Sequence, residues 1–214
     1  MPITLTARAL LFDMDGTLVD SHAVVERIWS SFADRFGFDV HHIVSIAQGV
    51  RMLDTIRAQA PSGTDVDALH AELSLLELDD TDGIVQIPGA LAFLESLPAT
   101  SVALVTSAAR PLVASRMGAI GATVPAVLVS AEDVAHGKPA PDAYLRAAEL
   151  LGVAPHEAIV FEDAEAGIRA GLAAGMRVVV VGDWQSETTV GLPRVSDYAN
   201  IGVSYEGDVL RLAI

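Results

Sequence analysis

Two aspartates, Asp13 and Asp15, follow a short apolar run near the start of the chain and are the strongest chemical feature of the sequence. In an extended backbone, residues two apart face the same way, so both carboxylates can point into one site while Met14 points away. Neighbouring carboxylates repel each other unless a proton or a cation lies between them. Carboxylate oxygens suit a hard divalent ion such as Mg²⁺. A polar turn after a strand is the plainer interpretation of the pair taken alone.

The elements that must position these residues are short apolar runs without polar alternation, which are typical of strands buried on both faces of a parallel sheet. The runs are Ala9–Phe12, Val102–Val105, Ala126–Val129, Ala158–Phe161 and Val178–Val181. Helical patterns lie between them, at Gly89–Leu97, Pro111–Ile120, Pro141–Leu151 and Ala164–Ala174. This alternation predicts an α/β fold with a Rossmann-like open parallel sheet and helices on both faces.

The stretch from about residue 17 to 86 breaks this alternation and contains no convincing strand. Apolar residues recur at helical spacing from Val24 to Phe36, and further helical segments follow at Val40–Ala47, Met52–Ala60 and Val66–Leu78. We therefore expect an all-helical cap domain, residues 18–86, inserted after the first strand of a catalytic core made of residues 1–17 and 87–214. A hairpin is expected at Ile201–Ile214.

Polar residues directly follow two other predicted strands. Thr106 and Ser107 come after one, and Glu162 and Asp163 come after another. Ligands of open parallel sheets bind beyond the carboxyl ends of the strands, so we expect these side chains to converge with Asp13. Capping of the helices that follow is the alternative role for each residue alone.

A single lysine, Lys138, lies in the turn Gly137-Lys138-Pro139-Ala140-Pro141, whereas all other basic residues except the histidines are arginines. A compact ammonium group suits a position between a carboxylate and a phosphoryl oxygen. A surface lysine in a proline-rich turn is the alternative.

Together these residues resemble the motifs of the haloacid dehalogenase superfamily of phosphatases. Asp13-Met14-Asp15-Gly16-Thr17 is similar to the first motif, Thr106-Ser107 to the second, Lys138 to the third and Glu162-Asp163 to the fourth. Order and approximate spacing agree over nearly the whole chain, and the helical insert lies where the family places a mobile cap. Longer stretches resemble the phosphatases of sugar and polyol phosphates, such as those acting on 2-deoxyglucose 6-phosphate or glycerol phosphate.

The resemblance implies a Mg²⁺-dependent phosphoric monoester hydrolase. Asp13 would attack phosphorus and form an aspartyl phosphate, and Asp15 would act as general acid and then general base. The metal would be held by the Asp13 carboxylate, the Asp15 backbone carbonyl and Asp163, with Glu162 acting through water. The phosphate would be bound by Thr106, Ser107 and Lys138. The cap would close over the substrate, with hinges near Leu18–Asp20 and Val85–Pro88.

Arg51, which follows Gly49-Val50 in the predicted cap, is the candidate for substrate choice because related enzymes have a substrate-contacting loop there. A helix-surface arginine is an equally good interpretation. Gly49-Val50-Arg51 also leaves open a β-phosphoglucomutase-like enzyme, although Thr17 after Asp-Gly looks more like the phosphatases. A dehalogenase fits less well because those relatives lack the second acid that Asp15 supplies. A non-catalytic metabolite-binding module is the alternative from another class.

The amino-acid composition excludes several classes of binding partner and of chemistry. The chain has 214 residues and 51% hydrophobic residues, which suffice for a large core, and a formal net charge of −15. Strong negative charge disfavours general binding of nucleic acid or anionic membranes. The absence of cysteine excludes disulfides and thiolate chemistry. With neither a signal-peptide pattern nor an apolar run of membrane-spanning length, we expect a cytoplasmic monomer that acts on a small phosphorylated metabolite.

Overall fold

The computed structural model describes residues 3–214, and its central feature is a parallel sheet of six strands in the order β6-β5-β2-β7-β8-β9. Neighbouring strands run parallel throughout this sheet. The strands are β2 (Ala9–Phe12), β5 (Val102–Val105), β6 (Val127–Val129), β7 (Ala158–Glu162), β8 (Arg177–Val181) and β9 (Arg194–Val195). Every residue of β2, β5 and β7 is buried, as expected for strands covered on both faces.

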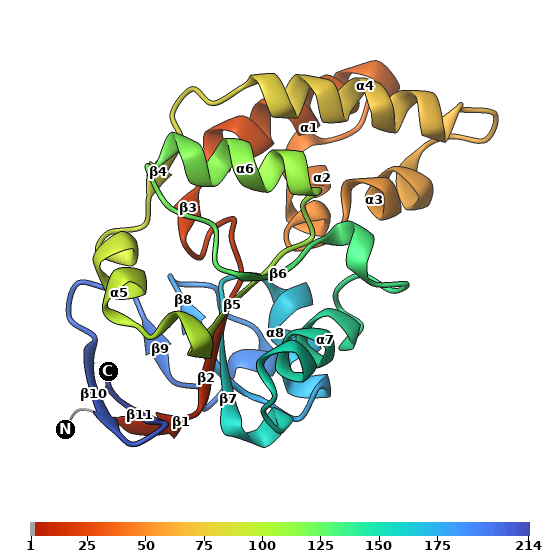
Figure 1. The fold of residues 1–214 in the computed structure, drawn as a ribbon. Helices are drawn as coiled ribbons and strands as arrows, with labels where there is room; N and C mark the ends of the chain where they lie inside the picture. Colours follow the sequence, from red (N-terminus) through yellow and green to blue (C-terminus); the bar gives the residue numbers. More distant parts are fainter. Residues whose placement is uncertain (1–2) are drawn as a thin grey trace.

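Helices cover both faces of the sheet, and alternate residues of each strand contact opposite layers. Phe12 packs with the layer formed by α5 (Ala90–Ser96) and α6 (Arg110–Ala119). Leu11 packs with the layer formed by α7 (Asp142–Leu151) and α8 (Glu165–Ala173). The predicted Rossmann-like open α/β sheet is therefore confirmed (Figure 1).

Four helices follow the first strand of this sheet and lie together at one end of the molecule, beyond the carboxyl ends of the strands (Figure 1). They are α1 (His22–Phe36), α2 (Val40–Ala47), α3 (Met52–Gln59) and α4 (Val66–Asp79). We call them the cap helices. Apolar residues of α1 (Trp29 and Phe32 among them) are buried at the spacing that predicted the helix.

The chain enters and leaves the cap helices through two adjacent segments, β3 (Val19–Asp20) and β4 (Val85–Gln86), which pair antiparallel. The expectation of no strand between residues 17 and 86 was wrong at this point. A strand of two residues is too short to produce a recognisable alternation, and its pairing depends on a partner more than sixty residues away in the chain.

The C-terminal hairpin is confirmed as β10 (Gly202–Glu206) and β11 (Val209–Ala213), and β1 (Thr4–Ala7) pairs antiparallel with β11 to make a separate sheet of three strands. Among the described residues, none of the helices is both long and apolar enough to span a membrane.

Candidate active site

The site forms where β2, β5 and β7 end, because parallel strands place their carboxyl ends at one edge of the sheet. Asp13 follows β2, Thr106 follows β5, and Glu162 ends β7 immediately before Asp163. Lys138 reaches the same edge from the loop between β6 and α7. The structure therefore brings together residues that are up to 150 positions apart in the chain.

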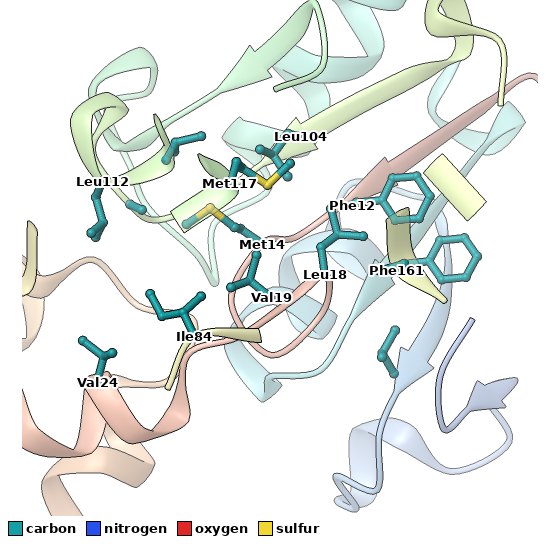
Figure 2. Packing of buried hydrophobic residues seen from close by; sticks show 14 of the residues in the cluster. Phe12, Met14, Leu18, Val19, Val24, Ile84, Leu104, Leu112, Met117 and Phe161 are labelled. Atoms are coloured by element: carbon teal, nitrogen blue, oxygen red, sulfur yellow. The ribbon is translucent and has the colours of Figure 1, made fainter. Parts of the chain in front are cut away.

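The turn after β2 directs Asp13 and Asp15 toward one side and Met14, which lies between them in the sequence, toward the other. Met14 is fully buried in the hydrophobic core, near Met117 of α6 and Leu18 (Figure 2). Its carbonyl accepts the backbone N–H groups of Leu18 and Val19 at 2.8 and 2.9 Å, which closes the turn. Gly16 has a φ of +79°, and a Cβ atom there would lie 2.0 Å from Oδ2 of Asp163. Glycine is thus required both by the backbone and by the approach of Asp163.

Lys138 is the buried cation of the site. Its Nζ donates to Oδ1 of Asp13 at 2.5 Å, to Oε1 of Glu162 at 2.6 Å and to the carbonyl of Val105 at 3.2 Å. The residue is only 3% exposed. Burial by itself lowers the pKa of Lys138, but the carboxylates of Asp13 and Glu162 outweigh it and raise that pKa, so the ammonium stays charged.

Glu162 is completely buried and both of its carboxylate oxygens are engaged. Oε1 accepts from Lys138 and from the hydroxyl of Tyr144 at 3.0 Å, and Oε2 accepts from the backbone N–H groups of Asp163 and Ala164 at 3.0 and 3.1 Å. Burial, reinforced by the nearby Glu162 charge, raises the pKa of Tyr144 well above its ordinary value, which keeps the phenol a donor. Glu162 therefore fixes the position of the Lys138 ammonium group through a direct hydrogen bond. Tyr144 was not anticipated from the sequence.

Three carboxylates meet here with one ammonium group. Ligand atoms of Asp13, Glu162 and Asp163 lie within 4.8 Å of one another, and all three residues are buried. Burial raises the pKa of Asp13 to about 7, although Lys138 opposes this. Burial, with the charges of Glu162 and Asp13, also raises the pKa of Asp163 well above its ordinary value. A divalent cation with oxygen ligands fits this excess of negative charge.

Asp163 is oriented by two side chains from earlier in the chain. The hydroxyl of Thr17 donates to its Oδ1 at 2.9 Å, and the amide of Gln48 donates to its Oδ2 at 3.3 Å. Gln48 lies in the loop between α2 and α3, so this contact joins the cap helices to the sheet edge.

Asp15 is held by two different residues, neither of which was anticipated from the sequence. The hydroxyl of Ser21 donates to Oδ1 of Asp15 at 2.7 Å, and the guanidinium of Arg116 lies 2.6 Å from Oδ2. Arg116 is on α6 beside the buried residues Leu112, Val113 and Met117. A charged residue on the apolar face of a helix is the signal that could have revealed it.

Thr106 and Ser107 turn toward different partners. Thr106 is buried, and its Oγ1 accepts the backbone N–H of Ala108 at 3.1 Å, within the turn rather than at the first turn of α6. The hydroxyl of Ser107 donates to the carbonyl of Gly49 at 2.8 Å, which is a second contact with the loop between α2 and α3.

A cavity of about 850 Å³ lies between the cap helices and the sheet edge. Asp13, Asp15, Thr106, Ser107 and Asp163 line it from the sheet side. Residues of the cap helices and their loops line it from the other side, among them Trp29, Gln48, Arg51, Arg57 and His70. The volume is large enough for a small metabolite beside the carboxylates.

Arg51 lines this cavity but its guanidinium is already paired. Its Nε donates to Asp54 at 2.6 Å, and its other nitrogens lie 3.4 Å from the carbonyls of Val134 and Ala135, in the loop that precedes Lys138. The side chain thus connects α3 with the core at the edge of the cavity.

Comparison with known proteins identifies the family of the chain. A profile of the haloacid dehalogenase-like hydrolases matches residues 7–175, well over half of the chain. The chain belongs to the haloacid dehalogenase-like hydrolase family. The family, the fold class and the hydrolase class expected from the sequence are thereby confirmed.

Individual proteins are similar to this chain over most of its length. Hexitol phosphatase A of Escherichia coli is 42% identical over 178 residues, covering 81% of this chain and 82% of its own. Glycerol-1-phosphate phosphohydrolase 2 of Saccharomyces cerevisiae is 33% identical, covering 83% and 76%. A hydrolase from Pseudomonas syringae of known structure aligns with a TM-score of 0.76 at 25% identity, covering 88% and 93%.

Proposed function

We propose that this protein is a Mg²⁺-dependent phosphatase that hydrolyses small phosphorylated sugars or polyols through an aspartyl phosphate on Asp13. The observation that carries the proposal is the buried carboxylate of Asp13, 2.5 Å from Lys138, at the wall of an 850 Å³ cavity that Asp15 also lines. The named activities of the relatives from E. coli and S. cerevisiae support the substrate class.

In the first step an oxygen of Asp13 attacks phosphorus, and the bond between phosphorus and the ester oxygen breaks. Asp15 delivers a proton to the departing alcohol. In the second step Asp15 takes a proton from water, and this water attacks the aspartyl phosphate to release inorganic phosphate and regenerate Asp13. Two easier displacements replace one difficult displacement.

We assign binding of the phosphoryl oxygens to Lys138, Thr106 and the backbone N–H groups of the turn after β2. Ser107, which follows Thr106, is assigned the same role. Positioned donors of this kind supply most of the catalysis in phosphoryl transfer. Lys138 is well suited to this task because Glu162 and the Val105 carbonyl already fix the direction of its ammonium group.

Asp13 and Asp163 are the proposed ligands of Mg²⁺, with the Asp15 backbone carbonyl completing the protein's contribution and Glu162 acting through water. When bound, the ion offsets the repulsion between the anionic nucleophile and the phosphate. The fit rests on the three buried carboxylates and their single ammonium partner.

Residues 18–86, which contain the cap helices, are proposed to form a domain distinct from a core of residues 1–17 and 87–214. The strands β3 and β4 are proposed to be its hinge. The adjacent pairing of these two short strands supports this division. Arg51 is proposed to contact the distal part of the substrate, since it lines the cavity from the cap side. Closure of the cap would exclude water from the aspartyl phosphate.

We expect the enzyme to act as a cytoplasmic monomer on a free metabolite. The net charge of −15 supports the absence of nucleic-acid and membrane partners.

The test is a phosphate-release screen over sugar and polyol phosphates, with Mg²⁺ and with excess EDTA. Release of inorganic phosphate from hexitol or glycerol phosphates is expected, with Mg²⁺ required. Isomerisation of glucose 1-phosphate without phosphate release would instead identify a mutase. Tight binding of one ester with no turnover of any would identify a non-catalytic binding module.

A further inference from the structure

Arg116 is a buried arginine that lies between two carboxylates from different parts of the fold. One of its terminal nitrogens lies 2.6 Å from Oδ2 of Asp15, and the other lies 2.6 Å from Oε1 of Glu77. Glu77 is on α4, a cap helix, whereas Arg116 is on α6 of the sheet's helical layer. Only 3% of the Arg116 side chain is exposed.

This arrangement fixes both oxygens of Asp15. Ser21 holds Oδ1 from the start of α1, and Arg116 holds Oδ2 from α6. The two contacts leave the carboxylate little freedom to rotate, and all three side chains line the cavity. The orientation of Asp15 toward a substrate is therefore set by its neighbours rather than by its own rotamer preference.

A contribution to folding stability does not explain why Arg116 is paired with Asp15 and Glu77. The Nε atom of Arg116 is buried without a hydrogen-bond partner among residues 3–214, and an unpaired buried donor costs free energy. A buried ion pair is weak evidence for stability, because desolvation offsets much of the attraction. The two carboxylates are nevertheless matched to the two terminal nitrogens of one planar guanidinium, whose fixed geometry sets their relative positions more strictly than an ammonium group does.

We propose that Arg116 is a positioning residue for the acid–base carboxylate of Asp15, and that Glu77 makes this positioning depend on the placement of α4. The proposal rests on the proposed function, in which Asp15 protonates the leaving alcohol. When α4 is in the position seen here, Glu77 holds Arg116 against Asp15. Displacement of α4 removes one of the two anchors of the guanidinium and loosens the carboxylate.

Leaving groups distinguish positioning of the acid from a purely structural role. A polyol leaves as a poor alkoxide and needs a proton from Asp15, whereas p-nitrophenol leaves readily as an anion. The ratio kcat/KM reports the steps up to departure of the alcohol and excludes hydrolysis of the aspartyl phosphate, which is common to all esters. In Arg116→Met we expect kcat/KM to fall by about tenfold or more with a hexitol phosphate, since general acid catalysis contributes about 10²–10⁴-fold. With p-nitrophenyl phosphate we expect kcat/KM to fall by less than about threefold.

Companion variants make the result decisive. Arg116→Lys should restore only part of the rate that Arg116→Met loses with the hexitol phosphate. Glu77→Gln should also lose more rate with the hexitol phosphate than with p-nitrophenyl phosphate, but by a smaller factor than Arg116→Met. The double variant Arg116→Met/Glu77→Gln should lose no more rate than Arg116→Met alone, because Glu77 is proposed to act only through the contact between Arg116 and Asp15. Arg35→Met removes the exposed pair between Arg35 and Glu72 on α1 and α4 and should leave both rates unchanged.

Equal losses of kcat/KM on the two esters, or no loss on either, would overturn the inference while leaving the phosphatase intact. If Arg116→Met does not fold, as judged by circular dichroism, Glu77→Gln decides by the same ratio of rates. A wild-type protein that releases phosphate from neither ester would instead refute the proposed function, and the role of Arg116 with it.

Discussion

The ammonium group of Lys138 lies 2.5 Å from Oδ1 of Asp13, although the two residues are separated by 125 positions in the chain. The same nitrogen donates to Glu162, so one buried cation holds the proposed nucleophile and a supporting carboxylate together. Removing the ammonium group would leave two uncompensated buried carboxylates, so we expect the site to respond strongly to the loss of Lys138.

Lys138→Met should abolish most activity and weaken the fold. We expect kcat to fall by about 10²–10³-fold, the scale of losing one preorganised donor at a transition state. Loss of the only ammonium group beside Asp13 and Glu162 should lower the free energy of unfolding by about 3–5 kcal/mol. Phosphate release and denaturant unfolding measure the two effects. Arg146→Met, which removes an exposed pair on α7, is the control, and near-normal turnover of Lys138→Met would contradict the assignment.

Asp13→Asn should remove turnover without weakening the fold. The amide has nearly the same shape but cannot form an acyl phosphate, so kcat should fall by at least about 10³-fold. Because burial raises the pKa of Asp13 to about 7, its ionised form is unfavourable where it lies, and a neutral isostere does not add to that cost. Thermal unfolding in EDTA should give a midpoint no lower than that of the wild type. Normal phosphate release would exclude Asp13 as nucleophile.

Chelation should stop the reaction, and Mg²⁺ should both restore it and stabilise the protein. Binding to the folded state alone adds about 2.7 kcal/mol at a hundred times the dissociation constant. The thermal midpoint should therefore rise with Mg²⁺ concentration. Asp163→Asn should lose most of this rise, whereas Glu149→Gln, which changes an exposed carboxylate, should keep it. Indifference of activity and midpoint to EDTA would rule out the metal site.

Much of the arrangement around Asp13 could be anticipated because it follows from the sheet. Buried runs such as Ala9–Phe12 and Val102–Val105 identified parallel strands with the bounds that the structure gives, and parallel strands bring their carboxyl ends to one edge. Thr106 and Asp163 could be placed near Asp13 by this rule alone.

The contacts that could not be anticipated depend on how helices pack. Arg116 meets Glu77 only because α6 lies beside α4, and helix–helix contacts are not encoded by a local pattern in either segment. Tyr144 reaches Glu162 because α7 packs on the face of the sheet that carries Leu11. Such pairs follow from tertiary packing rather than from spacing along one element.

Glu165 should make stability depend on acid pH. Although burial opposes it, hydrogen bonds from Ser186 and Thr188, with Arg169 and Trp184, lower the pKa of Glu165 from 4.5 to about 2. A lowered pKa in the folded state gives stability that is complete above the unfolded value of 4.5 and is lost as pH falls toward 2.

Glu165→Gln should therefore unfold at a lower temperature than the wild type at pH 7. The difference should shrink as pH falls from about 4.5 to about 2. For a chain of this length about 2–4 °C corresponds to each kcal/mol, so a deficit of several degrees is expected. Calorimetry at several pH values measures it, with the exposed Glu149→Gln as control. A deficit that is constant down to pH 2 would refute this origin.

Gly167 of α8 should be intolerant of alanine because of Glu162. A Cβ atom at Gly167 would lie 1.5 Å from Oε1 of Glu162, the oxygen that accepts from Lys138. The carboxylate must move, so Gly167→Ala should cost about 1–3 kcal/mol of folding free energy and lower kcat together with it. Gly118 of α6 is the matched control, since nothing lies within 4 Å of its Cβ position. Gly118→Ala should leave kcat unchanged and stabilise the helix by about 0.5–1 kcal/mol. Equal behaviour of the two variants would mean that the position of Glu162 does not matter to the site.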